Sequence, residues 1–528
     1  MNYLSNRAEI HQKIFIGLLI LLVVGMQFSH FLVSITIITL SANFLIEGDY
    51  ITKLKRVWNY KTIVLFVGLF ALHVAGIFWS TDTGYAEHDV QIKLPLLALP
   101  VIIGASNRLS RKQFEWILLF FLATSIASSL VGSVIYFILS KPGDDYRLMS
   151  PFMSHIRLSL MMGIALFSAI YLSQTSVQWQ RFKGWFIGIA FWFMVYLFML
   201  RAMSGIVAVM VAGFVILWVI SSDHKIKYAN AIKVAILASG MLFAGYLYWQ
   251  VQSFYTINEL DLTTEDSHSI GGEKYHFGVD LKLYENGNYV YAFIADQELK
   301  NGWNKRSNLD FDGEDLKGQK LKSTLIRYLT SKNLRKDTEG VKAMTNLDVW
   351  AVENGIANER FLNGKSMNTM IYRYIWEIHN YRIGFNPQGN SLGQRFLFWK
   401  NGTQILKENW MYGVGTGDVQ LAFNEQYEKM PYHIKEKYRL RAHNQFLTMG
   451  ITFGVFGFIY FIVTMISGFW VRPNASSYLF LGSFIIFMVS MLDEDTLETQ
   501  FGVTYAVFFY FLFLFHQPLT GEGASSDK

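Results

Sequence analysis

Residues 184–220 read GWFIGIAFWFMVYLFMLRAMSGIVAVMVAGFVILWVI, and Arg201 is the only charged residue among them. Apolar runs at 184–200 and 203–220 flank this arginine. A helix rises about 1.5 Å per residue, so runs of this length approach the roughly 30 Å hydrocarbon core of a bilayer. A helix also satisfies its own backbone polar groups, which lipid requires. The stretch therefore predicts two transmembrane helices joined by a tight turn.

The same pattern extends over most of the 528-residue chain, in which hydrophobic residues make up 52% and charged residues only 16%. Soluble domains contain about 25% charged residues. The apolar runs predict twelve membrane spans, at residues 14–29, 31–46, 62–79, 90–105, 114–140, 156–173, 184–200, 203–220, 231–249, 445–470, 476–491 and 502–517. The fourth is the weakest because it is short and contains Pro95 and Pro100. We therefore predict an all-α polytopic membrane protein.

Basic residues are distributed unequally between the short segments that join these spans. With the N-terminus in the cytoplasm, the inner segments hold fifteen lysines and arginines and the outer segments hold five. The inner residues are Arg7, Lys13, Lys53, Lys55, Arg56, Lys61, Arg108, Arg111, Lys112, Arg181, Lys183, Lys225, Lys227, Lys233 and Arg472, and the outer residues are Lys93, Lys141, Arg147, Arg157 and Arg201. This asymmetry supports twelve spans with both termini inside. It also explains the formal charge of +6 without a nucleic-acid partner.

The N-terminal apolar run follows Arg7 and Lys13, as in a signal peptide. It lacks a clean small-residue cleavage site and a second span follows at once, so we interpret it as a retained helix. The chain contains no cysteine, which excludes disulfide bonds and thiolate metal sites and names no compartment.

Residues 250–443 form a polar segment that separates transmembrane helices 1–9, within residues 1–249, from helices 10–12, within residues 444–528. By the charge pattern it lies outside the cytoplasm. Residues 275–283 and 289–294 flank Glu285-Asn286-Gly287-Asn288, which predicts a hairpin. Thr345-Asn346-Leu347-Asp348 resembles a capping box, and 366–382 and 394–408 have helical spacing. We therefore expect a large mixed α/β periplasmic domain.

Several unusual polar residues, most of them ionisable, are predicted to lie at one level, the outer membrane interface. They are His155, Arg157, Arg201, Arg439, Arg441, His443, Asn444, Asp493, Glu494, Asp495 and Glu498, whereas Arg395 lies in the outer domain at a depth that sequence does not fix. The alternative for the arginines is that they anchor helices with their charged groups in water. Their concentration at one level favours a site, because ionisable groups at membrane spans are costly. The alternative for His443 is a solvated surface histidine.

The acidic residues between the last two spans have three interpretations. They are counter-charges for the arginines, an ordinary outer loop, or a metal site built by residues 493–498; we favour the first. Gly413-Val414-Gly415-Thr416-Gly417-Asp418 likewise has two interpretations, a phosphate cradle or a glycine-rich turn before a helix, and such turns are common.

Three ordered motifs resemble the O-antigen ligase family, which also contains O-antigen polymerases and protein O-oligosaccharyltransferases. They are Leu392-Gly393-Gln394-Arg395 followed by Trp399, then Asn409-Trp410-Met411-Tyr412-Gly413-Val414-Gly415-Thr416-Gly417-Asp418, then Arg441-Ala442-His443-Asn444-Gln445-Phe446-Leu447 with Gly450. The resemblance implies a glycosyltransferase with a GT-C-type membrane fold. It implies transfer of a glycan from a polyprenyl diphosphate carrier to an acceptor, which in ligases is a sugar of the lipid A core.

The resemblance also implies functional roles for a loop histidine, a loop arginine and an arginine at a span boundary. These fall on His443, Arg395 and Arg201. The chain departs from the family in the long stretch of outer domain before Arg395, so the acceptor stays open.

The chemistry of these residue types agrees with the implied reaction. Arginine stays protonated and offers forked donors to phosphate oxygens, which suits Arg157, Arg201, Arg395 and Arg441 to binding a diphosphate leaving group. Arg439 joins them because Arg439, Arg441 and His443 stand at alternate positions, so in an extended segment all three would point to one side. Histidine accepts a hydroxyl proton near neutral pH, which suits His443 to general base. Asn444, His155, Glu494 and Glu498 are expected to support the site. No metal or cofactor is needed.

The predicted function is therefore that of an O-antigen ligase in the bacterial inner membrane, with its active site facing the periplasm. A polymerase, which uses the same donor, is the nearest alternative. A transporter or flippase is a second alternative, but such proteins favour internal repeats and charges at mid-membrane, whereas these charges lie at one interface. A glycan-binding protein without catalysis is the weakest.

Overall fold

The computed structural model describes residues 2–140, 146–222, 228–260, 267–278, 282–362, 366–470 and 477–518. Lys141, Lys225, Lys227 and Arg472, which entered the charge comparison, lie outside these residues. The chain forms two compact units. The first comprises Met1–Ile236 and Phe398–Lys528, and the second comprises Leu237–Leu397.

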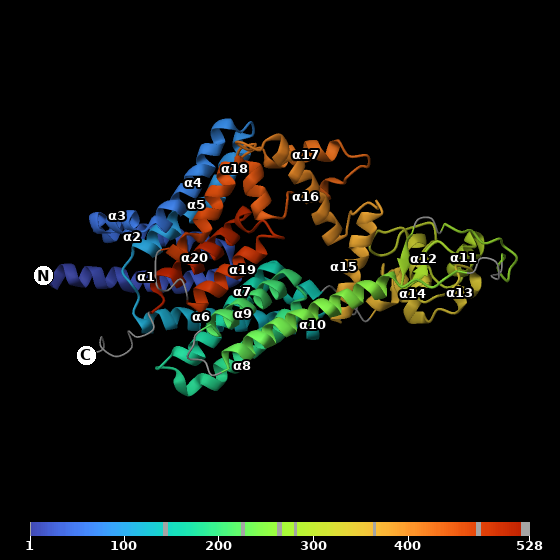
Figure 1. The fold of residues 1–528 in the computed structure, drawn as a ribbon, viewed down its shortest axis with the longest axis horizontal. Coiled ribbons are helices and arrows are strands. Elements are labelled where there is room, and N and C mark those ends of the chain that lie inside the picture. Colours follow the sequence, from blue (N-terminus) through green and yellow to red (C-terminus); the bar gives the residue numbers. More distant parts are fainter. Residues whose placement is uncertain are drawn as a thin grey trace. The chain divides into compact units, whose positions relative to one another are not determined.

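The first unit is a bundle of apolar helices (Figure 1). Its helices are α1 (Asn2–Phe28), α2 (His30–Glu47), α3 (Tyr50–Asn59), α4 (Lys61–Ala75), α5 (Thr83–Ala105), α6 (Arg111–Val134), α7 (His155–Thr175), α8 (Lys183–Leu200), α9 (Met203–Ile220), α17 (Val419–Glu428), α18 (Gln445–Ile466), α19 (Tyr478–Ser490) and α20 (Gln500–His516), whereas α10 (Ala229–Tyr255) and α16 (Ser391–Glu408) have residues in both units. Each predicted span overlaps one of these helices.

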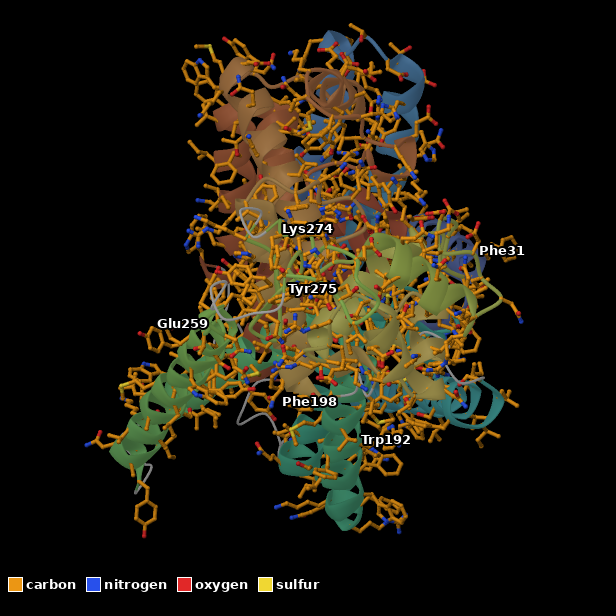
Figure 2. All side chains as sticks on the ribbon, turned by 90° about the vertical axis from the view of Figure 1, so that its right-hand side faces the viewer. Phe31, Trp192, Phe198, Glu259, Lys274 and Tyr275 are labelled. Atoms are coloured by element: carbon orange, nitrogen blue, oxygen red, sulfur yellow. The ribbon has the colours of Figure 1, made fainter. Side chains whose placement is uncertain are left out.

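Ten helices within the described residues are long and apolar enough to cross a membrane, and α19 and α20 are shorter apolar helices. The all-α polytopic fold is thus confirmed, while the number twelve stays a prediction. Every residue of α20 after the first is buried, from Phe501 to His516, so this helix is surrounded by its neighbours. Apolar side chains project from the surrounding helices, as Phe31 does with 73% of its surface exposed (Figure 2).

The fourth span, the weakest in the sequence, is a continuous helix. Helix α5 begins after Asp82, whose side chain accepts a hydrogen bond from the Tyr85 amide at 2.9 Å, and it continues through both prolines. Membrane helices tolerate proline when neighbouring elements satisfy the freed backbone groups. The placement of Lys93 in an outer loop was wrong, because Lys93 lies inside α5 and is fully buried.

The connections of the bundle gather at two ends. At one end Arg56 donates to the Ala105 carbonyl at 2.9 Å, and Thr62 donates to the Ser467 carbonyl at 3.0 Å. At the other end the loop between α19 and α20 contacts residues at the starts of α9 and α18. Arg56 belongs to a predicted inner segment, whereas Asn444 and Asp495 belong to predicted outer ones; which compartment each end faces stays a prediction.

Among its described residues the second unit is mainly helical with one two-stranded hairpin, so it has less sheet than the predicted mixed α/β domain. It contains β1 (Tyr284–Glu285), β2 (Asn288–Tyr289), α11 (Asp296–Asn304), α12 (Leu321–Ser331), α13 (Thr338–Lys342), α14 (Asn346–Glu353) and α15 (Met367–Arg382). Asn286 and Gly287 both have positive φ, as the two-residue turn requires, although the strands are shorter than predicted. The capping box at Thr345 and Asp348 is confirmed. Trp303, Leu325 and Tyr328 form part of the core.

Candidate functional site

The loop between α19 and α20, which includes the 3-10 turn η10 (Thr496–Glu498), joins distant parts of the first unit. Its four acidic side chains have different partners. Asp493 accepts a hydrogen bond from Ser204 at the start of α9, and Glu494 lies beside His443. Asp495 accepts from the backbone before α18, and Glu498 pairs with Arg441. We call residues 491–499 the acidic loop.

His443 occupies a tight turn that the acidic loop holds in place. The amides of His443 and Asn444 donate to the two carboxylate oxygens of Asp495, each at 3.0 Å. Asn444 then caps α18 by accepting from the Leu447 amide at 3.0 Å. The prediction of an extended segment at 439–443 was wrong, because His443 has a φ of 45°. A left-handed residue turns two successive amides toward one anion, and Asp495 supplies that anion.

The imidazole of His443 lies between an aromatic ring and a carboxylate. Its ring stacks on Phe398, with centroids 5.7 Å apart and planes at 26°. Nδ1 lies 3.7 Å from Glu494 Oε2, slightly beyond hydrogen-bond distance, and one third of the side chain (33%) is exposed. A carboxylate at this position favours the tautomer with hydrogen on Nδ1 and stabilises an imidazolium. The ring is therefore oriented and also accessible.

Arg441 is held as a cation by partly buried partners. Its two terminal nitrogens donate to the Tyr85 hydroxyl at 3.0 Å and to Glu498 Oε2 at 3.1 Å. Burial alone would lower the pKa of Arg441, but Glu498, Tyr85 and the carboxylates of Asp495 and Asp89 together outweigh burial and raise that pKa above its ordinary value. Nε has no hydrogen-bond partner among the described residues, although it is buried. Buried donors are rarely left unused, so this N–H is suited to an incoming oxygen ligand.

Arg439 does not join this group. Its Nε donates to the Ile434 carbonyl at 2.9 Å, and its Nη1 pairs with Glu428 at the end of α17. The prediction that Arg439, Arg441 and His443 project to one side was wrong, because these residues contact three different sets of partners. The left-handed turn at His443 interrupts the extended backbone, in which side chains at alternate positions would have pointed to the same side.

Arg201 and Arg157 lie at the same end of the bundle against aromatic rings. Arg201 ends α8 in a left-handed conformation, with its guanidinium 5.2 Å from the ring centre of Tyr146. Tyr146 meets the ring of His155 edge-on at 5.9 Å. Arg157 lies 5.6 Å from the ring centre of Phe501 and interacts electrostatically with Glu494. The acidic loop therefore connects to the neighbourhoods of both arginines, through Ser204 and through Glu494.

The glycine-rich stretch is a structural clamp. Five consecutive amides, from Gly413 to Gly417, donate to Asn409, Ile451, Thr452, Gly76 and Ser80 in that order. A phosphate cradle needs free amides, so that interpretation was wrong and the turn interpretation holds. Gly413 has a φ of +72°, and a Cβ there would lie 2.3 Å from the Thr452 carbonyl group. Only glycine allows this close approach of backbones.

The clamp also fixes the start of α5. The Asp418 carboxylate accepts from the amides of Thr81 and Asp82, each at 2.8 Å in its shortest contact. Thr416 donates to the His73 carbonyl at 2.7 Å. Helices α4, α5 and α18 are thereby tied together (Figure 1).

Sequence reasoning missed a row of buried ionisable residues on α4 and α5. His73 Nδ1 lies 3.3 Å from Asp89, Asp89 pairs with Lys93 at 2.9 Å, and Lys93 pairs with Glu498 at 3.0 Å. The sequence did contain a signal for this row, because Asp89 and Lys93 are four residues apart, as in a helical ion pair, and an apolar run follows them. It was overlooked because the span was taken to begin at residue 90.

Arg395 belongs to the second unit, whereas His443 belongs to the first. Its Nη1 donates to the Ser391 carbonyl at 3.4 Å. Nearby, Glu377 is buried and accepts from the Leu392 amide at 2.7 Å. Burial raises the pKa of Glu377 above its ordinary value, although Arg373 and Arg395 oppose this. Arg395 thus faces the charge of a buried carboxyl within its own unit.

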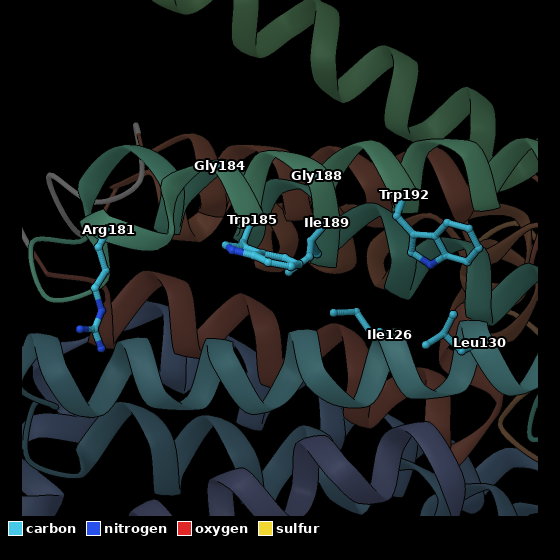
Figure 3. A pocket seen from close by; sticks show the side chains of 8 residues that line it. All are labelled: Ile126, Leu130, Arg181, Gly184, Trp185, Gly188, Ile189 and Trp192. Carbon is cyan, nitrogen blue, oxygen red and sulfur yellow. The ribbon is translucent and has the colours of Figure 1, made fainter.

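A groove of about 650 Å³ lies apart from these residues, between α6 and α8 (Figure 3). It is lined by Ile126, Leu130, Arg181, Gly184, Trp185, Gly188, Ile189 and Trp192, none of which is a predicted site residue. Within the part of the chain that the structure describes, no group of three or more histidine, aspartate or glutamate side chains has an arrangement suited to a metal ion.

Comparison with known families supports the motif assignment. Residues 353–462 match the family model described as O-Antigen ligase. No curated protein matches the chain. The matched segment includes Arg395, the glycine clamp, Arg441 and His443, and it ends within α18. The family predicted from the three motifs is confirmed, and the chain carries the O-antigen ligase domain at residues 353–462.

Proposed function

We propose that this protein is a membrane glycosyltransferase that moves a glycan from a polyprenyl diphosphate carrier to a lipid A-core acceptor at the periplasmic face. The proposal rests chiefly on one juxtaposition. The acidic loop holds an accessible imidazole and a buried cation with an unused N–H two residues apart, inside a domain of the O-antigen ligase family. A base and an anion-binding group are the two functions that this transfer needs.

The reaction assigns a role to each group. The acceptor hydroxyl oxygen bonds to the anomeric carbon while the bond from that carbon to the diphosphate oxygen breaks. The hydroxyl proton passes to Nε2 of His443, since Nδ1 faces Glu494. The electron pair of the broken bond leaves with the diphosphate. Arg441, together with Arg201 and Arg157, stabilises the charge that builds there.

Arg395 is assigned to the same diphosphate by its motif. Arginines are better suited to this task than lysines, because the planar fork contacts two phosphate oxygens at once. Aromatic rings beneath Arg157 and Arg201 restrict those side chains before a ligand arrives. Proton acceptance and charge stabilisation are thus both supplied by side chains of the protein itself.

The activity is tested with purified protein in liposomes containing carrier-linked glycan and lipid A-core. Wild-type protein is expected to form glycan-capped lipid, and Glu494→Gln is expected to form it more slowly. Carrier-linked glycan that lengthens without capping lipid A-core would indicate a polymerase instead. Movement of the glycan across the bilayer without any new glycosidic bond would contradict the enzyme and indicate a transporter.

The orientation is tested by labelling introduced cysteines, since the natural chain has none. Lys300→Cys lies in the second unit and Lys55→Cys lies in α3. In intact cells an impermeant reagent is expected to label residue 300 and not residue 55. The reverse result would place the site on the cytoplasmic face and contradict the proposal.

A further inference from the structure

Lys93 is a buried ammonium group inside a helix that qualifies as a membrane span. None of its surface is exposed, and its two partners are Asp89 at 2.9 Å and Glu498 at 3.0 Å. Charged groups within membrane helices are costly and usually mark function. The proposed transfer reaction gives Lys93 no direct role, so its presence needs a separate account.

Glu498 links Lys93 to the candidate site. Its Oε2 accepts from both Lys93 and Arg441, at 3.0 and 3.1 Å, while its Oε1 accepts from Gln445 at 2.9 Å. One carboxylate oxygen thus lies between two cations. The position of the Arg441 guanidinium depends on Glu498, and the charge of Glu498 depends in turn on Lys93.

The charges in this row are balanced. Asp89 and Glu498 carry two negative charges, and Lys93 and Arg441 carry two positive charges. Removing the lysine leaves two carboxylates close together with one cation. Like charges at such distances drive one carboxyl group to take up a proton. A protonated Glu498 would no longer fix the guanidinium.

A purely structural role is the alternative, since the row connects α5 to the acidic loop. Buried ion pairs, however, contribute little net stability compared with apolar side chains of similar volume. This row also ends at the arginine whose Nε has no partner among the described residues. The small net stability of buried ion pairs and the unpartnered Nε of Arg441 both favour a role in orienting this arginine.

We propose that Lys93 is a positioning residue, which holds Glu498 ionised so that Arg441 keeps two donors on protein partners and presents Nε–H to a phosphate oxygen of the donor. The inference rests on the proposed function. Asp89 balances the lysine charge, and His73, 3.3 Å from Asp89, ends the row in the membrane unit.

The test compares a charge-breaking variant with a charge-restoring one. Lys93→Met is expected to weaken binding of unglycosylated polyprenyl diphosphate about tenfold or more, and to raise KM for the glycan donor more than it lowers kcat. Lys93→Met with Asp89→Asn restores the balance between Glu498 and Arg441, and it is expected to recover most of that affinity. Lys300→Met, which breaks the ion pair with Asp312 in the other unit, is the matched control.

The outcomes separate this inference from the function on which it rests. Normal carrier affinity in Lys93→Met would overturn the positioning role. So would a folded double variant that binds no better than Lys93→Met, because charge balance would then be irrelevant. If Lys93→Met alone fails to fold, the double variant decides. Wild-type protein that neither binds the carrier nor transfers glycan would overturn the proposed function instead.

Discussion

Two arginine–glutamate pairs, one in each unit, are built differently. In the second unit Arg327 of α12 donates through Nε to Glu285 at 2.8 Å, and its guanidinium lies 4.2 Å from the ring centre of Trp376. Asn358 donates a hydrogen bond to the other carboxylate oxygen of Glu285, so both oxygens have a partner. In the first unit Arg441 contacts Glu498 at 3.1 Å, and its Nε has no hydrogen-bond partner among the described residues. We call the first pair closed, because none of its buried donors lacks a partner among the described residues. We call the second pair open, because the buried Nε of Arg441 lacks one.

The difference shows how structure separates a scaffold from a site. The closed pair leaves no buried donor without a partner among the described residues, so it suits a role in holding the fold together. An open pair keeps a donor for a ligand, and it is embedded in contacts between segments far apart in the sequence, such as Lys93 and Glu498. We therefore expect substitutions around Arg441 to affect transfer, and substitutions around Arg327 to affect stability.

The largest effect is expected at His443, beside the open pair. His443→Ala should lower the transfer rate by about 10²- to 10⁴-fold, the usual effect of losing a general base. Binding of the carrier should persist, because the arginines and the lipid provide it. Donor affinity and transfer rate are measured on the same purified variant. Normal turnover would remove His443 from catalysis, and lost binding without a separate rate defect would make it a phosphate ligand.

Arg201→Ala and Arg395→Ala should each lower transfer by about 10²- to 10³-fold while the protein stays folded and inserted, because each removes a donor from the developing charge. Arg→Lys at either position should recover only part of the activity, since a point charge lacks the planar fork. Full recovery with lysine at both positions would show that these residues act as general electrostatic anchors.

In the second unit the effects should concern stability, and Lys336 provides a pH test. Burial lowers the pKa of Lys336 to about 7 in the folded unit, with Arg335 lowering it further and Asp337 opposing. The unfolded chain keeps an ordinary lysine pKa of about 10.4 and so binds more protons between about pH 7 and 10. Stability should therefore rise with pH across this window, by up to a few kcal/mol.

The measurement is denaturant unfolding of the second unit, within the full chain, at pH 7 and pH 9. Lys336→Met should be more stable at pH 7 and should lose this part of the pH dependence. An unchanged slope in Lys336→Met would mean that other groups produce it.

The smallest effect is expected at the capping box of α14. Thr345 accepts from the Asp348 amide at 3.2 Å, and Asp348 accepts from the Thr345 amide at 2.7 Å. Thr345→Ala should lower the free energy of unfolding by about 1 kcal/mol and leave transfer unchanged. Thr345→Ser, which keeps the hydroxyl, is the control. A loss of transfer in Thr345→Ala with unchanged stability would break the division between the two units.

The sequence predicted what depends on local pattern. Apolar runs located the membrane helices, and Thr345 with Asp348 identified a cap, because periodicity and capping act over a few residues. It did not predict the left-handed turn at His443, which depends on Asp495, a residue about fifty positions away. Lys93 was misplaced for a similar reason, because its partner Glu498 in the acidic loop lies 405 positions away. The motif residues were found, but their partners required the fold.

The central claim is that the open pair serves transfer and the closed pair serves stability. The most direct test measures transfer rate and melting temperature on Arg441→Gln and Arg327→Gln in parallel. We predict that Arg441→Gln loses about 100-fold or more in transfer with little change in melting temperature, because it removes a donor from the developing charge. Arg327→Gln should melt at a lower temperature and transfer at nearly the wild-type rate below it. Near-normal transfer by folded Arg441→Gln would contradict the account.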